Sequence, residues 1–156
     1  MMLYFISVVP LFAQNTAFKA LLNTIYEKDF PVIYPEELAD KKDWVVLDAR
    51  ELREFEVSHL PHSIWVGYEA FDLSKVEMFN KDQPIVVYCT VGYRSQKVGE
   101  QLRSAGFREV YNLYGGIIHW VNESNPVYKN QVETEEVHVY SRTWGIWLQK
   151  GVKIHD

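Results

Sequence analysis

A single cysteine, Cys89, stands where an apolar run ends and a helical pattern begins, in the stretch PIVVYCTVGYRSQKVGEQLRSAGF. The thiolate of cysteine is a strong nucleophile and a helix N-terminus stabilises negative charge, so a thiol at this junction is a candidate catalytic group. Arg94 follows after four residues and adds a permanent positive charge with a fork of N–H donors. An inert core cysteine is the alternative, which the nearby glycine and arginine disfavour.

The loop between Cys89 and the predicted helix is short and contains a glycine. Successive N–H groups of such a loop can converge on an anion where a helix begins. We therefore predict a substrate-binding loop next to the cysteine. It consists of Thr90, Val91, Gly92, Tyr93, Arg94 and Ser95.

Two reactions use a thiolate in a loop of this kind. In sulfur transfer, the thiolate takes a sulfane sulfur from an anionic donor, the amides hold the resulting persulfide, and an acceptor then attacks it. In phosphoryl transfer, the thiolate attacks phosphorus, and the reaction needs a wider loop and usually a carboxylic acid that protonates the leaving group. Cysteine phosphatases have five residues between the cysteine and the arginine, whereas this chain has four. The narrower loop favours sulfur transfer over phosphoryl transfer.

The composition restricts the other possibilities. The 156 residues suit one domain with terminal extensions, and the net charge is −5. A lone cysteine rules out an internal disulfide, a C-x-x-C redox pair and a multi-cysteine zinc site. His59 and His62 share one turn but are too few to hold a metal ion, so we predict no metal and no organic cofactor. The chain has no basic run, so nucleic acid is not an expected partner.

Strand and helix patterns alternate along the central part of the chain. Apolar runs predict strands, and amphipathic segments between them predict helices. The strands are expected at residues 43–50, 63–67, 83–89 and 109–113, and the helices at 51–60, 71–79, 94–107 and 115–122. This order is typical of an α/β fold with a mostly parallel central sheet and helices on both faces. In such folds, sites lie beyond the carboxyl ends of strands.

Asp48 and Cys89 both fall at the carboxyl ends of predicted strands. Asp48 and Arg50 are expected to form an ion pair or to bind loop backbone, because buried charges need partners. We therefore assign these two residues to structural support of the site rather than to catalysis. The helix that follows is expected to direct Leu52 and Phe55 inward.

Residues 1–14 are almost entirely apolar up to Ala13. The stretch is too short to span a bilayer as a helix, so no integral membrane span is expected. It resembles the apolar core and cleavage end of a secretory signal peptide, although no Lys or Arg precedes it, and this predicts export to a periplasmic or other extracytoplasmic space. The alternative is an apolar arm packed on a cytoplasmic domain. Residues 15–32 are expected to form an N-terminal helical extension with Thr16 as a cap.

Residues 128–156 are expected to form a C-terminal extension. The polar stretch at 123–136, which contains one proline, predicts a linker. The part beyond it carries Trp144 and Trp147, and we expect these indoles to dock it on the domain. An arm that binds a partner is the alternative.

Two segments, VVLDARELREFEVSHLPHSIWV and IVVYCTVGYRSQKVGEQLRSAGFREVYNLYGGIIHWV, resemble the rhodanese family over residues 33–127. The first is similar to the family's Asp-x-Arg strand end, its Glu-Phe helix and its His-hydrophobic-Pro turn. The second is similar to the Cys-x-x-Gly-x-Arg-Ser loop, its helix and the Gly-Gly before a Trp-bearing helix. The resemblance implies a rhodanese-like three-layer fold in which Cys89 accepts sulfur, the amides of residues 90–95 hold the persulfide, and Arg94 attracts the anionic donor.

Thr90 stands where many active rhodaneses carry a basic residue, so one charge that would attract thiosulfate is missing. We predict a rhodanese-type sulfurtransferase that moves sulfane sulfur from an anionic donor, such as thiosulfate, to a thiol, cyanide or protein acceptor through a Cys89 persulfide. One alternative is a non-catalytic sulfur-carrier or docking module of the same fold. Another is a cysteine phosphatase or arsenate reductase of related fold. No oligomeric state is predicted.

Overall fold

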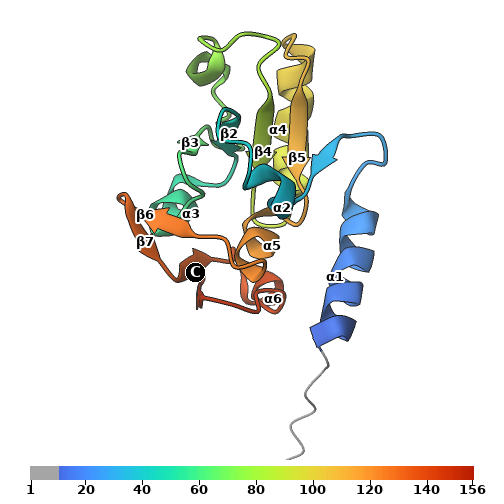
Figure 1. Cartoon of the computed structure of the whole chain (residues 1–156), viewed down its shortest axis with the longest axis vertical. Coiled ribbons are helices and arrows are strands. Elements are labelled where there is room, and N and C mark those ends of the chain that lie inside the picture. The colour runs from blue at the N-terminus through green and yellow to red at the C-terminus, as the bar shows by residue number, and fades with distance from the viewer. Residues whose placement is uncertain (1–10) are drawn as a thin grey trace, which may run out of the picture.

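The computed structural model of the protein describes residues 11–156, with side chains from residue 14 onward. Its centre is a five-stranded sheet in the order β1-β5-β4-β2-β3, in which every neighbouring pair is parallel (Figure 1). The strands are β1 (Val32–Ile33), β2 (Val45–Asp48), β3 (Ile64–Trp65), β4 (Ile85–Tyr88) and β5 (Val110–Leu113). β2 to β5 lie within the predicted ranges. β1, which lies just before the helix that begins at Pro35, was not predicted.

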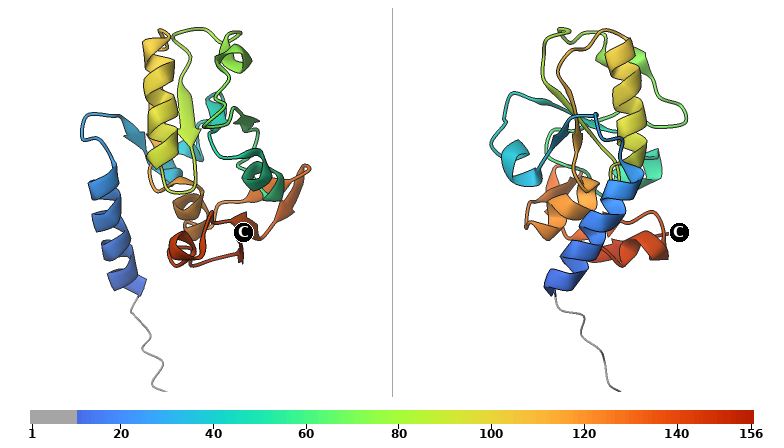
Figure 2. Two further views of the ribbon diagram at one scale, coloured as in Figure 1. Left: turned by 180° about the vertical axis from the view of Figure 1, so that it is seen from behind. Right: turned by 90° about the vertical axis from the view of Figure 1, so that its right-hand side faces the viewer.

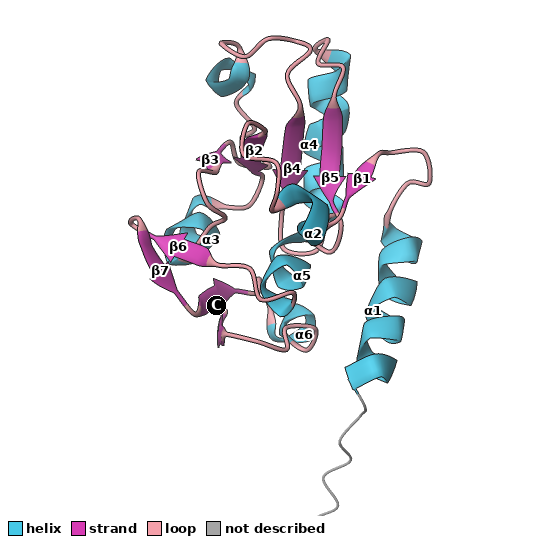
Figure 3. Cartoon of the chain, in the orientation of Figure 1, coloured by secondary structure: helices cyan, strands magenta, loops and turns pink. Residues whose placement is uncertain are grey.

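Helices cover both faces of the sheet. α4 (Tyr93–Ser104) packs on one face, and α2 (Pro35–Leu38) and α5 (Gly116–Asn122) pack on the other (Figure 2, right). α3 (Leu52–Val57) follows β2, and the segment predicted as a helix at 71–79 contains the short 3-10 helix η1 (Leu73–Val76). The alternation of strands and helices is visible in Figure 3. The predicted α/β architecture with a parallel sheet is confirmed.

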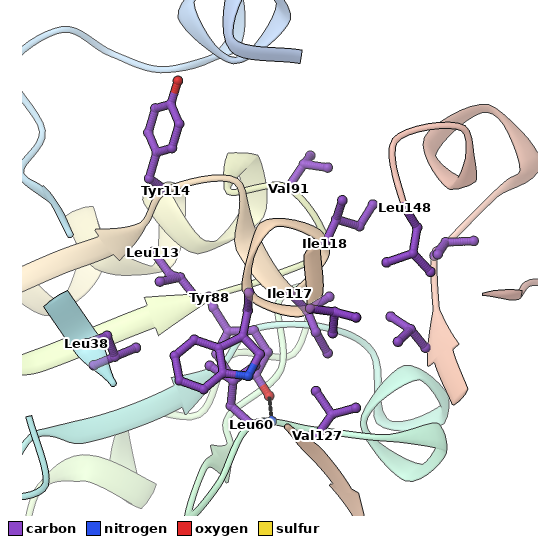
Figure 4. Packing of buried hydrophobic residues seen from close by; sticks show 14 of the residues in the cluster. Leu38, Leu60, Tyr88, Val91, Leu113, Tyr114, Ile117, Ile118, Val127 and Leu148 are labelled. Carbon is purple, nitrogen blue, oxygen red and sulfur yellow. Dashed lines mark hydrogen bonds between the residues drawn. The ribbon is translucent and has the colours of Figure 1, made fainter. Parts of the chain in front are cut away.

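β4 is buried on both sides, which explains its unbroken apolar sequence. Successive side chains of a strand point to opposite faces. Val86 and Tyr88 accordingly join a cluster with residues of α2 and α5 (Figure 4), while Ile85 and Val87 join a second cluster with residues of α4. The strand that ends just before Cys89 is therefore packed between two apolar layers.

The N-terminal helix α1 (Leu11–Ile25) begins earlier than the sequence suggests. It runs through the expected boundary at residue 14, so Thr16 lies inside the helix and the prediction that it caps the start is wrong. α1 contacts the C-terminal segment, since the ring of Phe18 stacks on Trp147 at 5.3 Å. The signal peptide predicted at residues 1–14 falls mainly on residues 1–10, outside the described residues. Within residues 11–156, no helix is long and apolar enough to cross a membrane.

The C-terminal segment is folded rather than a linker followed by an arm. The hairpin of β6 (Val127–Lys129) and β7 (Val132–Thr134) occupies most of the stretch predicted as a linker. Asn130 and Gln131 form its two-residue turn, both with positive φ, as tight hairpins require. The stretch is polar because the hairpin is solvated, and its Val132 is 69% exposed. The predicted linker is therefore wrong.

The rest of the segment returns to the domain. β8 (Glu136–His138) pairs in parallel with β9 (Val152–Ile154), and the short α6 (Arg142–Gly145) lies between them. The hydroxyl of Ser58, at the end of α3, donates to the carbonyl of Glu136 at 2.5 Å. These contacts place the C-terminal segment next to α3 and close to the carboxyl ends of the strands.

Candidate active site

Cys89 follows β4 directly, and its loop turns sharply into α4. Gly92 makes this turn with a φ of +109°, a backbone conformation that side chains disfavour. The amide of Gly92 donates to the Sγ of Cys89 at 3.1 Å, and the hydroxyl of Ser95 lies 3.5 Å from the same sulfur. The whole Cys89 residue is 1% exposed, yet it lines an open cavity. The loop thus directs one backbone donor, the Gly92 amide, at the sulfur and places the Ser95 hydroxyl nearby.

Asn112 of β5 holds the loop in this shape. Its side-chain oxygen accepts a hydrogen bond from Ser95 at 2.7 Å, and its side-chain nitrogen donates to the carbonyl of Gly92 at 2.8 Å. Asn112 is fully buried. The sequence reading missed this residue, because an asparagine inside an apolar strand has no motif. The only signal was its polar character within a buried run.

Arg94 is held by Glu54 of α3. Its two terminal nitrogens donate to the two carboxylate oxygens at 2.7 and 2.8 Å, and one of them also donates to the hydroxyl of Thr90 at 3.0 Å. Burial alone would raise the pKa of Glu54, but the hydrogen bonds and charge of Arg94 outweigh it and lower that pKa. The prediction that Leu52 faces inward is wrong: it is 45% exposed. Glu54 takes the buried position because Arg94 neutralises it.

Asp48 and Arg50 form a buried ion pair in which nitrogen and oxygen lie 2.6 Å apart. Arg50 also donates to the carbonyl of Ser58 at 2.7 Å, and the hydroxyl of Tyr88 donates to Asp48. Burial raises the pKa of Tyr88, and the adjacent Asp48 charge raises it further. The pair links the end of β2 to the end of α3. Neither residue lines the cavity above the thiol, a geometry that fits their predicted supporting role.

Tyr26, which follows α1, supports the loop from the other side. Its hydroxyl donates to the carbonyl of Val91 at 2.5 Å and accepts from the amide of Gly115 at 2.8 Å. Burial raises the pKa of this phenol above its ordinary value. A Cβ atom on Gly92 would come within 2.1 Å of the Tyr26 oxygen, so the glycine is required by packing as well as by its φ.

The cavity above the thiol has a volume of about 380 Å³. It is lined by residues of the loop, of both terminal segments and of the segment after β3: Ile25, Tyr68, Cys89, Thr90, Val91, Tyr93, Arg94, Tyr140 and Trp144. Three of these, Ile25, Tyr140 and Trp144, come from segments outside the central α/β part. The sequence reading expected Trp144 to serve only in docking and did not anticipate the other two.

The structure brings all the predicted loop residues, 90–95, around Cys89. Tyr93 lies at the cavity wall and is 48% exposed. His59 places its Nδ1 3.0 Å from the carbonyl of Leu60, a contact within its own turn. Across residues 11–156, no group of three or more His, Cys, Asp or Glu residues could hold a metal ion.

A parallel α/β sheet with a cysteine loop at the carboxyl end of its central strand, closed by an arginine at the start of the next helix, defines a cysteine-loop α/β domain. The family described as the rhodanese-like domain matches residues 34–123, more than half of the chain. The chain therefore belongs to the rhodanese family.

Several known proteins are similar to it. Thiosulfate sulfurtransferase GlpE of Coxiella burnetii is 34% identical over 84 residues, which cover 54% of this chain and 78% of that protein. The tRNA uridine(34) hydroxylase of Photorhabdus laumondii is 32% identical over 93 residues, covering 56% of this chain and 26% of the hydroxylase. The crystal structure of thiosulfate sulfurtransferase from Pseudomonas aeruginosa superposes with a TM-score of 0.61 at 26% identity, covering 76% of this chain and 24% of that one.

Proposed function

We propose that the protein is a sulfurtransferase that carries sulfane sulfur on Cys89. The observation that carries this proposal is the amide of Gly92, 3.1 Å from the Cys89 sulfur at the base of an open cavity. A donor aimed at the sulfur can stabilise negative charge on a thiolate or on a persulfide. The similarity to thiosulfate sulfurtransferase GlpE supports the same reaction.

The reaction has two steps. In the first, the Cys89 thiolate attacks the sulfane sulfur of a donor, a bond forms between the two sulfurs, and the donor's own sulfur–sulfur bond breaks. With thiosulfate, sulfite leaves with the bonding electron pair. In the second step, an acceptor thiolate attacks the outer sulfur of the persulfide, takes it, and releases the Cys89 thiolate.

The surrounding residues keep the loop in place through both steps. Asn112 holds the carbonyl of Gly92, and Tyr26 holds the carbonyl of Val91, whose peptide unit carries the Gly92 amide directed at the sulfur. The reaction needs no change in the charge of Asp48 or Arg50, because their pair is closed and buried. A donor that is already in place, such as the Gly92 amide, requires little rearrangement when charge develops on the sulfur.

Intact mass spectrometry tests the proposal. After incubation with thiosulfate or an organic sulfane-sulfur donor and removal of the excess, the protein is expected to gain the mass of one sulfur atom. The gain should disappear on addition of cyanide, and a Cys89→Ser variant should show none while keeping the wild-type circular dichroism spectrum. Wild-type protein that never gains sulfur from any donor would overturn the proposal.

A further inference from the structure

We infer that the cavity above Cys89 selects a sulfur donor that carries an apolar group and at most one negative charge, in preference to thiosulfate. The inference rests on the proposed sulfur transfer and adds the chemical class of the donor. Three observations support it: the balance of charge at the cavity, the size of the cavity together with the chemistry of its walls, and the segments of the chain that supply those walls.

The cavity has no free positive charge among the described residues. Arg94 is the one charged residue in its walls, and both of its terminal nitrogens already donate to Glu54. The Glu54 side chain is fully buried and that of Arg94 is 13% exposed, so solvent screens the pair only weakly. The pair has no net charge. Thiosulfate carries two negative charges, and burying charge without a partner is costly.

The adjoining surface does not supply the missing charge. A second hollow shares Tyr68, Arg94 and Tyr140 with the cavity and is otherwise lined by Glu51, Leu52, Arg53 and Glu69. Its two carboxylates outnumber its one additional cation. A dianion that approaches Cys89 therefore meets no net positive charge from the side chains at the entrance of the cavity.

The walls favour an apolar group instead. Ile25, Tyr68, Tyr93, Tyr140 and Trp144 surround the space above the thiol. A volume of 380 Å³ equals that of roughly a dozen water molecules in the liquid. Thiosulfate has five heavy atoms and would leave most of it empty, whereas an aromatic ring could pack against the indole and phenol rings.

Part of this wall lies outside the rhodanese-like match at residues 34–123, since Ile25, Tyr140 and Trp144 belong to the flanking segments. Tyr140 contacts two residues of the folded chain: its amide donates to the Nδ1 of His138 at 3.1 Å, and its ring centre lies 5.0 Å from the Arg94 guanidinium carbon. The aromatic wall is therefore part of the folded structure.

The chemistry balances with an organic thiosulfonate, R–SO₂–S⁻. The Cys89 thiolate attacks the terminal sulfur, a bond forms between the two sulfurs, and the bond from that sulfur to the sulfonyl group breaks. The sulfinate R–SO₂⁻ leaves with the electron pair, and Cys89 keeps the persulfide. The group R occupies the aromatic cavity throughout.

The test compares three donors: benzenethiosulfonate, methanethiosulfonate and thiosulfate. For each, the second-order rate constant for sulfur gain on Cys89 is measured by quenched-flow intact mass spectrometry. It is divided by the rate constant of the same donor with a small free thiol, which removes differences in intrinsic reactivity. We expect the normalised rate for benzenethiosulfonate to exceed that for methanethiosulfonate by about tenfold, and to exceed that for thiosulfate by more.

Two variants locate the effect. Trp144→Ala should reduce the preference for the ring to about twofold or less, whereas Ile146→Ala, a 55% exposed residue two positions along, should leave it unchanged. Equal normalised rates for the two thiosulfonates, a faster rate with thiosulfate, or a preference that survives Trp144→Ala would overturn this inference while leaving sulfur transfer intact. Sulfur gain from none of the three donors would overturn the proposed function as well.

Discussion

At the scale of single residues, Glu54 determines how much charge Arg94 presents to a donor. The Glu54 carboxylate accepts hydrogen bonds from both terminal nitrogens of the Arg94 guanidinium, and the Thr90 hydroxyl contacts both side chains. Thr90 brings no charge to the site, and Arg94, the one charged residue in the cavity wall, is paired with Glu54. The loop geometry for sulfur chemistry is retained, while the electrostatic attraction for a small dianion is weakened.

Replacing Glu54 by Gln should separate these two effects. The Arg94 charge becomes available, so the rate constant for sulfur gain from thiosulfate is expected to rise by about tenfold. The buried guanidinium loses its charged partner, so the free energy of unfolding is expected to fall by about 3 kcal/mol, measured by urea denaturation. Glu56→Gln, an exposed position on the same helix, should change neither quantity. A thiosulfate rate that stays constant in Glu54→Gln would show that Glu54 does not limit anion binding.

The loop residues could be predicted from the sequence, because a cysteine, a glycine and an arginine at fixed spacing limit what the backbone can do. Glu54, Asn112 and Tyr26 could not be, since each acts on the loop from a distant part of the chain. The helical pattern of LREFEV directed attention to its apolar members, yet the buried position went to a carboxylate. Local periodicity does not reveal a charge that is neutralised by a residue forty positions later.

At the scale of elements, the turn from β4 into α4 packs closely against Tyr26, the residue that follows α1. Gly92 has both a positive φ and no room for a side chain, because the Tyr26 phenol occupies the adjacent space. Gly106, at the other end of α4, also has a positive φ (+95°), but nothing lies within 4 Å of its would-be Cβ. The two glycines therefore differ in packing and share the same kind of backbone constraint.

Alanine at these two glycines should give different results. Gly106→Ala is expected to cost about 1 kcal/mol of unfolding free energy from its backbone conformation, with unchanged sulfur gain on Cys89. Gly92→Ala should cost about 3 kcal/mol or more and slow sulfur gain strongly, because the loop or Tyr26 must move. Urea denaturation and intact mass measure the two effects. Equal costs at the two positions would contradict the packing role assigned to Tyr26.

The order of the elements was predictable further than their edges. Alternating apolar runs and amphipathic segments indicated four of the five parallel strands, and these strands place Asp48 and Cys89 at one edge of the sheet. The two-residue β1 and the hairpin at 127–134 gave no usable pattern. β1 depends on pairing with the distant β5, whereas the strands of the hairpin pair with each other and are largely exposed, so they lack the apolar run of a buried strand.

At the scale of the whole molecule, both terminal segments pack on the domain and on each other. Phe18 of α1 stacks on Trp147, and Gln14 donates to the carbonyl of Ile146 at 2.7 Å. His138 is 3% exposed within the C-terminal segment, where its Nε2 lies 3.5 Å from a carboxylate oxygen of Asp156. The Nδ1 of His138 accepts a hydrogen bond from the amide of Tyr140. This nitrogen must therefore carry no proton, which is the case in the uncharged ring.

Stability should consequently fall at mildly acidic pH. Burial lowers the pKa of His138 below its ordinary value of 6.5, although the charges of Glu54 and Asp156 offset part of this effect. A lowered folded-state pKa means that the unfolded chain binds the proton more readily, so the stabilisation is present above pH 6.5 and is lost as the pH falls below it. The urea midpoint should decline in this range, and His138→Gln should flatten the decline. Exposed His62→Gln serves as the control; an identical profile in His138→Gln would exclude His138 as the cause.

The loop and the cavity wall come from different parts of the chain, and this has a consequence for how donor selectivity can change. The cysteine loop is encoded within the rhodanese-like match, while much of the wall that faces an incoming molecule is encoded before and after it. Substitutions at the two ends of the chain can therefore alter selectivity and leave the bond-making residues untouched. Chimeras that keep Tyr26 and residues 34–123 and exchange the other flanking residues would be a way to change the preference for the donor.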